Sequence, residues 1–266
     1  MKRSNIIHHN IEADYFERLH PEGSSAYERA KVLKSMAFIA ENSGARDLCV
    51  DVGCGTGFVA SFELPLYKTV VATDISRKML EATRKKFGRS INLILCDAES
   101  LPLKAEVADL VSVSSVLHHL PRPFASMIAM LNVVKRHGYF FTTREPNLRR
   151  LRRFFDFFDN AVVGKIVQTF PVLRSECSAP MFRVEELDYD KVDVHYAAGL
   201  YIGQLTDLVN SKKFKVILAK SYHWVYPHSA VNWLERFLLR VNFFLEKVPF
   251  SDRFGRYVTV IARKQA

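Results

Sequence analysis

The amino-acid sequence predicts an α/β fold, with a mostly parallel sheet and helices on both of its faces. An apolar run at residues 48–52 leads into three glycines at alternate positions, Gly53, Gly55 and Gly57, which is typical of a buried strand that turns sharply. Short apolar runs and helical patterns then alternate up to residue 143. This alternation indicates βαβ units, in which helices join parallel strands. Two more apolar runs near the end of the sequence bring the expected strands to seven.

The expected elements follow from apolar periodicity and from capping residues. Ser76 is placed to cap a helix, because its hydroxyl can accept a hydrogen bond from a free backbone N–H of the first turn. The strands are expected at residues 48–52, 69–73, 91–95, 109–116, 139–143, 214–219 and 257–262. The helices are expected at residues 77–87, 124–135 and 201–210, and in an N-terminal arm at 6–42 that is broken at 20–23.

The pattern divides the chain into an arm, a core and two inserts. The helical arm is expected at 1–44 and the first part of the core at 45–146. A first insert is expected at 147–200. The C-terminal part of the core, at 201–266, is expected to contain a second helical insert at 222–255.

Composition places the chain among ordinary globular proteins. Of its 266 residues, 48% are apolar and 25% are charged. No apolar stretch reaches the roughly 20 residues that span a membrane, and neither a signal peptide nor a disulfide pattern is recognised. We therefore expect a cytoplasmic protein with reduced cysteines. The net charge of +10 is compatible with nucleic acid, an anionic membrane surface or an acidic substrate.

The glycine-rich turn indicates a binding site for a nucleotide-type cofactor. Glycine lets the backbone adopt positive φ and lets a ligand approach closely. A dinucleotide site needs the spacing G-x-G-x-x-G, but Phe58 stands where its third glycine would be. Asp51 precedes the glycines and would repel a pyrophosphate. The same carboxylate would attract a cofactor that carries an ammonium and a sulfonium group.

Residues 51–57, read as Asp-Val-Gly-Cys-Gly-Thr-Gly, resemble the first motif of the class I S-adenosylmethionine-dependent methyltransferases. The resemblance is strong over residues 45–145 and is closest to the small-molecule and quinone-type members. It implies a Rossmann-like, doubly wound sheet of seven strands, mostly parallel with an antiparallel C-terminal strand, and helical lid inserts. It also implies S-adenosylmethionine as cofactor and S-adenosylhomocysteine as product.

Several residues are expected to hold this cofactor. Asp74 ends the second strand 17 residues after Gly57, near the spacing of about 20 at which such folds place an acid on the ribose hydroxyls. Its alternative role is that of a turn residue at the strand end. The resemblance implies that Asp97 accepts from the adenine amine. It also places the N-terminal arm over the cofactor site and Tyr15 at the methionine end, where the residue could equally be a buried anchor of the arm. The full expected set is Tyr15, Asp51, Gly53, Cys54, Gly55, Gly57, Asp74, Ile75, Asp97, Ala98, Ser114 and His119.

The catalytic residues stay unassigned at this point. Three weak candidates for a base are His119, Glu145 and His195. His119 could instead pack or contact the cofactor, and Glu145 could pair with Arg144. The adjacent His118 and His119 do not predict a metal site, because neighbours face different directions and no third ligand is near in sequence. No metal is expected, and methyl transfer can proceed by alignment of the reactants alone.

The two inserts are expected to decide the acceptor. In the first, basic residues 149–153 lead into Phe154, Phe158, Val162 and Ile166, which recur every four residues. This helix is interpreted as a lid over the site, with a peripheral contact to an anionic membrane or to nucleic acid as alternatives. In the second insert, an apolar stripe at 231–248 is expected to form core or a dimer seam, or to wall a large pocket.

These observations predict a methyltransferase that acts on a small-molecule or lipid-like acceptor, such as an isoprenoid, a phenol or an amine. Two alternatives stay open: an RNA methyltransferase, and a non-catalytic protein that binds the cofactor as a scaffold. Nucleic acid is the weaker expectation, because the chain lacks the Asn-Pro-Pro-Tyr and Pro-Cys segments of base methyltransferases. A monomer and a homodimer are both compatible with the sequence.

Overall fold

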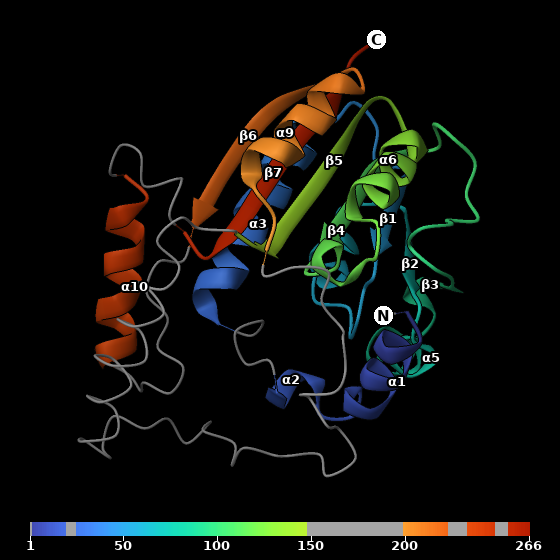
Figure 1. Cartoon of the computed structure of the whole chain (residues 1–266), viewed down its shortest axis with the longest axis horizontal. Coiled ribbons are helices and arrows are strands. Elements are labelled where there is room, and N and C mark those ends of the chain that lie inside the picture. The colour runs from blue at the N-terminus through green and yellow to red at the C-terminus, as the bar shows by residue number, and fades with distance from the viewer. Residues whose placement is uncertain (1, 20–24, 148–198, 223–232, 248–254) are drawn as a thin grey trace.

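The computed structural model describes residues 2–19, 25–147, 199–222, 233–247 and 255–266 (Figure 1). The aromatic helix expected at 154–166 lies outside the described residues, and so does His195. Among the described helices, none combines the length and the apolar character that are needed to cross a membrane.

Seven strands form one sheet in the order β3-β2-β1-β4-β5-β7-β6. β1 lies in the interior of the sheet between β2 and β4, with Val50 in parallel register with Val71 of β2 and Val111 of β4. β7 is antiparallel to both of its neighbours, which confirms the expected mostly parallel sheet with an antiparallel C-terminal strand. The strands are β1 (Leu48–Val52), β2 (Thr69–Asp74), β3 (Asn92–Leu95), β4 (Ala108–Ser114), β5 (Val134–Pro146), β6 (Phe214–Tyr222) and β7 (Tyr257–Lys264).

The described helices follow the expected pattern with local differences. They are α1 (Lys2–Glu12), α2 (Phe16–Leu19), α3 (Ala26–Asn42), α4 (Ala60–Glu63), α5 (Arg77–Phe87), α6 (Pro123–Val133), α9 (Ile202–Ser211) and α10 (Trp233–Leu245), with short 3-10 turns at Gly88–Ser90 and Leu117–His119.

Several boundaries differ from the expectation. The glycine turn leads into the short helix α4, which begins only at Ala60. The helix expected to reach residue 135 ends two residues earlier, because Val134 already has extended backbone angles and pairs with β4. β4 ends at Ser114, since Ser115 has a φ of 57° and turns the chain out of the sheet.

The side chains of alternate strand residues pack into two apolar cores, one on each face of the sheet. Val50 and Val52 of β1 pack in the core that contains Met127 of α6 and Leu205 of α9. Cys49 of β1 packs in the other core, with side chains of α3, α4 and α5. In Figure 1, α6 and α9 lie on one side of the sheet and α3 on the other. β1 is therefore covered on both faces, as its continuous apolar run predicts.

The turn after β1 depends on glycine. Gly53 has a φ of 69°, and a Cβ at this position would lie 2.4 Å from a methyl group of Val116. The N–H of the next residue, Cys54, donates to the carbonyl of Thr73 on β2 at 2.9 Å. The chain thus leaves β1 in a left-handed conformation and crosses to the end of β2. A side chain at Gly53 would both strain the backbone and displace Val116.

A buried polar cluster lies directly beneath this turn, on the α3 face of the sheet. Ser112 of β4 donates to Glu63 of α4, and its hydroxyl is 3.5 Å from Asp51. Both carboxyl groups are almost fully buried. Burial raises the pKa of Glu63 to about 7, and burial together with the charge of Glu63 holds the pKa of Asp51 well above its usual range. The pair therefore holds a proton at near-neutral pH.

As the pH rises, we expect the free energy of unfolding of the Glu63→Gln variant to fall less than that of the wild type. The folded pKa of Glu63, about 7, exceeds an unfolded value of about 4.3. Its stabilising contribution is therefore complete below about pH 4 and is lost as the pH rises through 7. Between pH 4 and 8 the free energy of unfolding of the wild type should fall relative to the variant, by at most about 3 kcal/mol. Urea unfolding at a series of pH values measures this difference.

The exposed Glu41 of α3 offers a matched control. Glu41→Gln also removes one carboxylate, but it should keep the pH dependence of the wild type. Parallel pH profiles for Glu63→Gln and the wild type would contradict the assignment of a raised pKa to Glu63.

Candidate functional site

A cavity of about 680 Å³ lies at the carboxyl ends of the central strands. Its volume is in the range of sites for small molecules and cofactors. Its walls come from the turns after β1, β2, β3 and β4 and from helix α1 of the arm. Most of the residues expected to bind a cofactor meet here, namely Asp51, Gly53, Cys54, Gly55, Asp74, Ile75, Asp97, Ala98, Ser114 and His119.

The floor of the cavity leaves space and polar atoms for a ligand. Gly55 has a φ of 54°, and the nearest atom to a Cβ at this position would be a ring carbon of Phe16, 4.0 Å away. Oδ2 of Asp51 and Oγ of Ser114 are buried and have no hydrogen-bond partner within the described part of the chain. A buried oxygen without a partner is costly unless a ligand or water bonds to it. An elongated cofactor with an ammonium group and hydroxyl groups fits this set of acceptors and the open backbone at Gly55.

Asp74 is fixed at the end of β2 by two backbone donors. Its Oδ2 accepts from the N–H of Gly55 at 2.9 Å, and its Oδ1 accepts from the N–H of Ser76 at 2.8 Å. Burial raises the pKa of this carboxyl, and the two backbone hydrogen bonds counteract part of that increase. Asp74 lines the cavity, and each of its carboxylate oxygens can accept a further hydrogen bond. The ribose role of Asp74 stays a prediction, and this geometry is compatible with it.

Asp97 is held in a similar way on the loop after β3. Its Oδ1 accepts from the N–H of Glu99 at 2.9 Å, and its Oδ2 forms an ion pair with Nζ of Lys2 at 2.6 Å. Lys2 also pairs with the carboxylate of Glu99. If Asp97 contacts an adenine amine, its carboxylate would therefore bind that amine and Lys2 at the same time.

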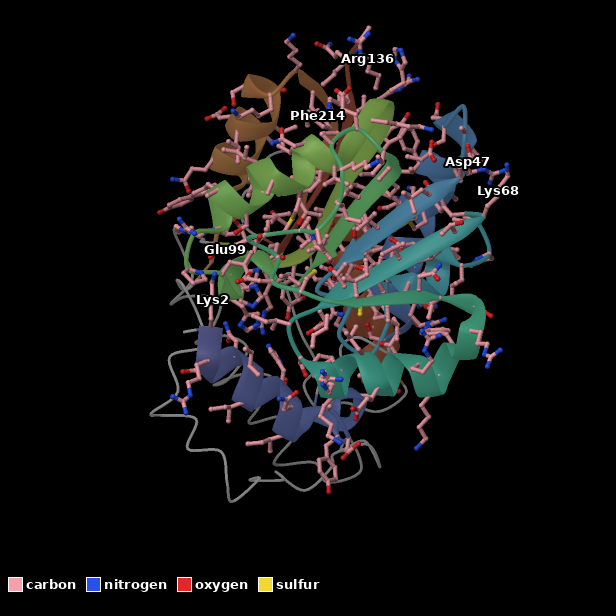
Figure 2. All side chains as sticks on the ribbon, turned by 90° about the vertical axis from the view of Figure 1, so that its right-hand side faces the viewer. Lys2, Asp47, Lys68, Glu99, Arg136 and Phe214 are labelled. Carbon is pink, nitrogen blue, oxygen red and sulfur yellow. The ribbon has the colours of Figure 1, made fainter. Side chains whose placement is uncertain are left out.

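Helix α1 forms one wall of the cavity and is anchored along its length. Lys2 at its first turn binds the β3 loop, and Figure 2 shows Lys2 beside Glu99, far from Arg136. In its middle, the Asn5 side chain donates to the carbonyl of His119 at 2.8 Å. Near its end, Asn10 accepts a hydrogen bond of 2.7 Å from the Ser76 hydroxyl. The arm is thus tied to three different turns around the cavity.

Two expected cofactor residues do not line the cavity in the described structure. Phe16 lines it, whereas the neighbouring Tyr15 is 36% exposed and does not. Gly57 lies against α5, where an added Cβ would come within 2.4 Å of the Phe87 ring. Gly57 therefore serves close packing of the turn against α5, and the cofactor contact of Tyr15 stays a prediction.

Glu145 is buried and bonds to a turn rather than lining the cavity. Its carboxylate accepts from the backbone N–H groups of Val116, Leu117 and His118 at 2.8 to 3.2 Å. The same carboxylate pairs with Nδ1 of His118 at 2.8 Å. Of the candidate bases, His119 lines the cavity and His195 lies outside the described residues. Glu145 is placed to orient the His118 ring, which also lines the cavity, and this role was missed in the sequence.

The arm was expected over the cofactor site, but no individual residue of α1 was expected to line it. Lys2, Asn5, His8, His9 and Glu12 all line the cavity. The signal that could have found them is the spacing of His8 and Glu12, four residues apart in the expected helical arm, which places both on one helix face.

The comparisons with known proteins agree with the motif and the cavity. Residues 50–142 match the family model described as a methyltransferase domain. A demethylmenaquinone methyltransferase of Clavibacter sepedonicus is 29% identical over 164 residues, which are 55% of this chain and 65% of the relative. A ubiquinone biosynthesis O-methyltransferase of Thiobacillus denitrificans is 31% identical over 105 residues, which are 38% of this chain and 45% of the relative. The chain thus covers less than two thirds of the length of either relative.

A solved structure shows the same fold at low identity. The crystal structure of a SAM-dependent methyltransferase from Archaeoglobus fulgidus aligns with 94% of this chain and 100% of its own, with a TM-score of 0.57 and 17% identity. The glycine motif, the strand order and the family match therefore lead to one conclusion. Residues 50–142 are a methyltransferase domain of the class I S-adenosylmethionine-dependent type, for which S-adenosylmethionine is the cofactor.

Proposed function

We propose that this protein transfers the methyl group of S-adenosylmethionine to a small-molecule acceptor of the phenol or quinol type. One observation carries the proposal: the motif residues and a set of aromatic and imidazole side chains line the same cavity. The acceptor class draws support from the names of the two relatives, which concern demethylmenaquinone and ubiquinone biosynthesis. A cytoplasmic location, a peripheral membrane contact and the oligomeric state stay predictions.

The residues on one side of the cavity would bind and orient the cofactor. When bound, the cofactor supplies a methyl group activated by a positively charged sulfur. The carboxylate of Asp74, held by the N–H groups of Gly55 and Ser76, would accept from the ribose hydroxyls, and two hydroxyls offered to one carboxylate make a strong charge-assisted pair. Oδ2 of Asp51 and Oγ of Ser114 offer acceptors for the ammonium group. The open backbone at Gly55 lets the cofactor lie flat on the turn.

The residues on the acceptor side would align a ring and exclude water. Phe16, Phe58, Pro146 and Tyr257 line the cavity as apolar and aromatic walls. The guanidinium of Arg144 lies 5.0 Å from the centroid of the Phe58 ring, which gives this wall a flat, partly cationic surface. A planar phenol would pack against such a surface with its oxygen toward the methyl group. In-line displacement at the methyl carbon would form the oxygen–carbon bond and break the carbon–sulfur bond, with loss of the phenol proton and neutral sulfur as the leaving group. This step would depend mainly on the alignment and on the cover that α1 provides.

We expect Asp74→Ala to weaken cofactor binding at least about tenfold, because hydrogen bonds to a charged group contribute about 1.5–3 kcal/mol. The exposed Asp47, which pairs with Lys68 at 2.7 Å, provides a matched control for the loss of one carboxylate. Asp47→Ala should bind S-adenosylmethionine within about twofold of the wild type, since the residue precedes β1 at the opposite end of the strands from the cavity. Titration calorimetry measures all three affinities. Equal binding by Asp74→Ala and the wild type would remove Asp74 from the ribose site.

The acceptor class is tested by transfer of labelled methyl from S-adenosylmethionine. The acceptors are an isoprenoid quinol, a simple phenol, an amine and bulk transfer RNA, each with the wild type and with Asp74→Ala. We expect label in the quinol or phenol with the wild type, and a rate at least about tenfold lower with the variant at subsaturating cofactor. Label in RNA alone would replace this proposal by an RNA methyltransferase. Cofactor binding without transfer to any of the four would favour the scaffold alternative.

A further inference from the structure

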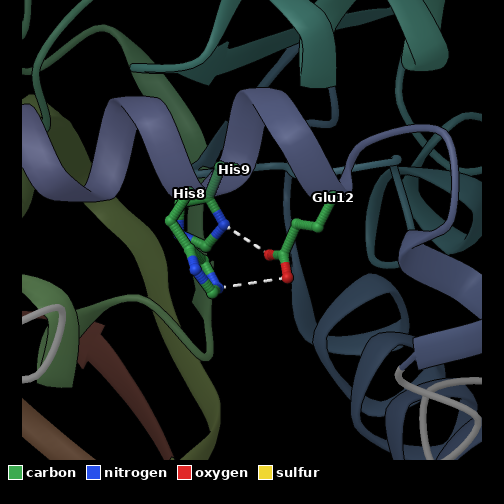
Figure 3. A group of neighbouring side chains, drawn as sticks. All are labelled: His8, His9 and Glu12. Carbon is green, nitrogen blue, oxygen red and sulfur yellow. Dashed lines mark hydrogen bonds and ion pairs between the residues drawn. The ribbon is translucent and has the colours of Figure 1, made fainter. Parts of the chain in front are cut away.

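Three metal-ligating side chains converge at the end of helix α1. Oε1 of Glu12 lies 2.7 Å from Nδ1 of His9, and its Oε2 lies 3.1 Å from Nε2 of His8 (Figure 3). One ligand atom from each residue can be chosen so that all three lie within 4.8 Å of one another. His8 and Glu12 are buried and His9 is partly buried. We call His8, His9 and Glu12 the arm triad.

We propose that the arm triad binds a divalent transition-metal ion of the Zn²⁺ type. Two imidazoles and one carboxylate form a known ligand set for zinc, which leaves a fourth position for water or another ligand. Magnesium and calcium are less suited, because they prefer sets of oxygen ligands. All three side chains line the cofactor cavity, so the fourth position of such an ion would be reached from the cavity.

The position of Glu12 in the helix gives an independent reason for a cation. Glu12 is the last residue of α1 and is 1% exposed. The C-terminal end of a helix carries partial negative charge, so a carboxylate is disfavoured there and a cation is favoured. Burial adds to the cost of an ionised carboxylate unless positive charge compensates it. A divalent ion held by Glu12 and the two imidazoles would add positive charge at this helix end.

The arm triad is also held in place before any ion binds. Asn5 is one turn before His9 and bonds to the carbonyl of His119, while Asn10 bonds to the Ser76 hydroxyl. The ring centroid of His119 is 5.4 Å from that of His9, so the site lies against the turn after β4. Little backbone ordering is then needed on metal binding, which favours affinity. This site is distinct from the pair of adjacent histidines at 118–119, for which the sequence offered no third ligand nearby.

The proposal is tested with metal alone on the full chain, freed of metal with a chelator. Titration calorimetry with Zn²⁺ should show one site per chain in the wild type. The double variant His8→Gln with His9→Gln should bind this ion at least about 100-fold more weakly, since even outer partners of metal ligands contribute 10- to 100-fold. Co²⁺ should give the visible absorption of a tetrahedral site with the wild type and lose it with the double variant.

His137 gives a matched control, because it is an exposed histidine near the start of β5, whereas the cavity lies at the carboxyl ends of the strands. Figure 2 shows the neighbouring Arg136 far from Lys2 of α1. Its φ is 63°, so we choose His137→Asn, as asparagine tolerates this conformation. This variant should keep the full affinity. If circular dichroism shows that the double variant is unfolded, Glu12→Gln and His9→Gln replace it, each with an expected loss of at least about tenfold.

Absence of stoichiometric Zn²⁺ binding by the wild type would overturn the proposal. Equal affinity of the wild type and the folded triad variants would also overturn it, because the ion would then bind elsewhere. Both results are independent of methyl transfer, since no cofactor or acceptor is present. Conversely, loss of cofactor binding in Asp74→Ala leaves the metal result unchanged.

Discussion

The hydrogen bond between the N–H of Gly55 and the carboxylate of Asp74 holds the functional end of this sheet together. It connects the turn after β1 to the end of β2 at 2.9 Å, next to the bond from Cys54 to the carbonyl of Thr73. A left-handed turn at Gly53 and the open position of Gly55 are needed to bring these groups together. Because one carboxylate both closes the turn and faces the cavity, packing and cofactor binding depend on the same residue.

A second constraint is the cost of the buried acids beneath and beside the cavity. Asp51, Glu63 and Asp74 have raised pKa values, with desolvation as the first cause in each. Such carboxyl groups do not maximise stability, because they lose favourable hydration on folding. A positively charged ligand would recover part of this cost. Oδ2 of Asp51, which has no hydrogen-bond partner among the residues that the structure describes, therefore favours binding of a cationic cofactor over an empty cavity.

The N-terminal arm does more than cover the cavity. Its first helix is bonded to the turns after β2, β3 and β4 through Asn10, Lys2 and Asn5. Motion of α1 would break these contacts together, so opening of the site and release of the arm are the same event. The arm triad lies at the end of this helix, and a bound ion there would add to the stability of the closed arrangement. An ion bound at the arm triad would thus affect access to the whole cavity.

The sequence by itself determined the strand pattern, the glycine turn and many of the residues that line the cavity. Those features are encoded locally: the apolar runs predicted all seven strands, and the motif at 51–57 placed Asp51, Gly53 and Gly55 in the cavity. The exact ends of the helices were not predictable, since Val134 joined β5 through pairing with β4.

Only the tertiary structure decided the rest, because it depends on groups that are far apart in the chain. Glu145 reaches back 27 residues to His118 and fixes the turn after β4. Lys2 meets Asp97 only because α1 lies across the end of β3. A contact between distant residues needs no local pattern, so neither pairing leaves a signal in the sequence. The spacing of His8 and Glu12 was visible, but their placement in the cavity required the docking of α1 against the sheet.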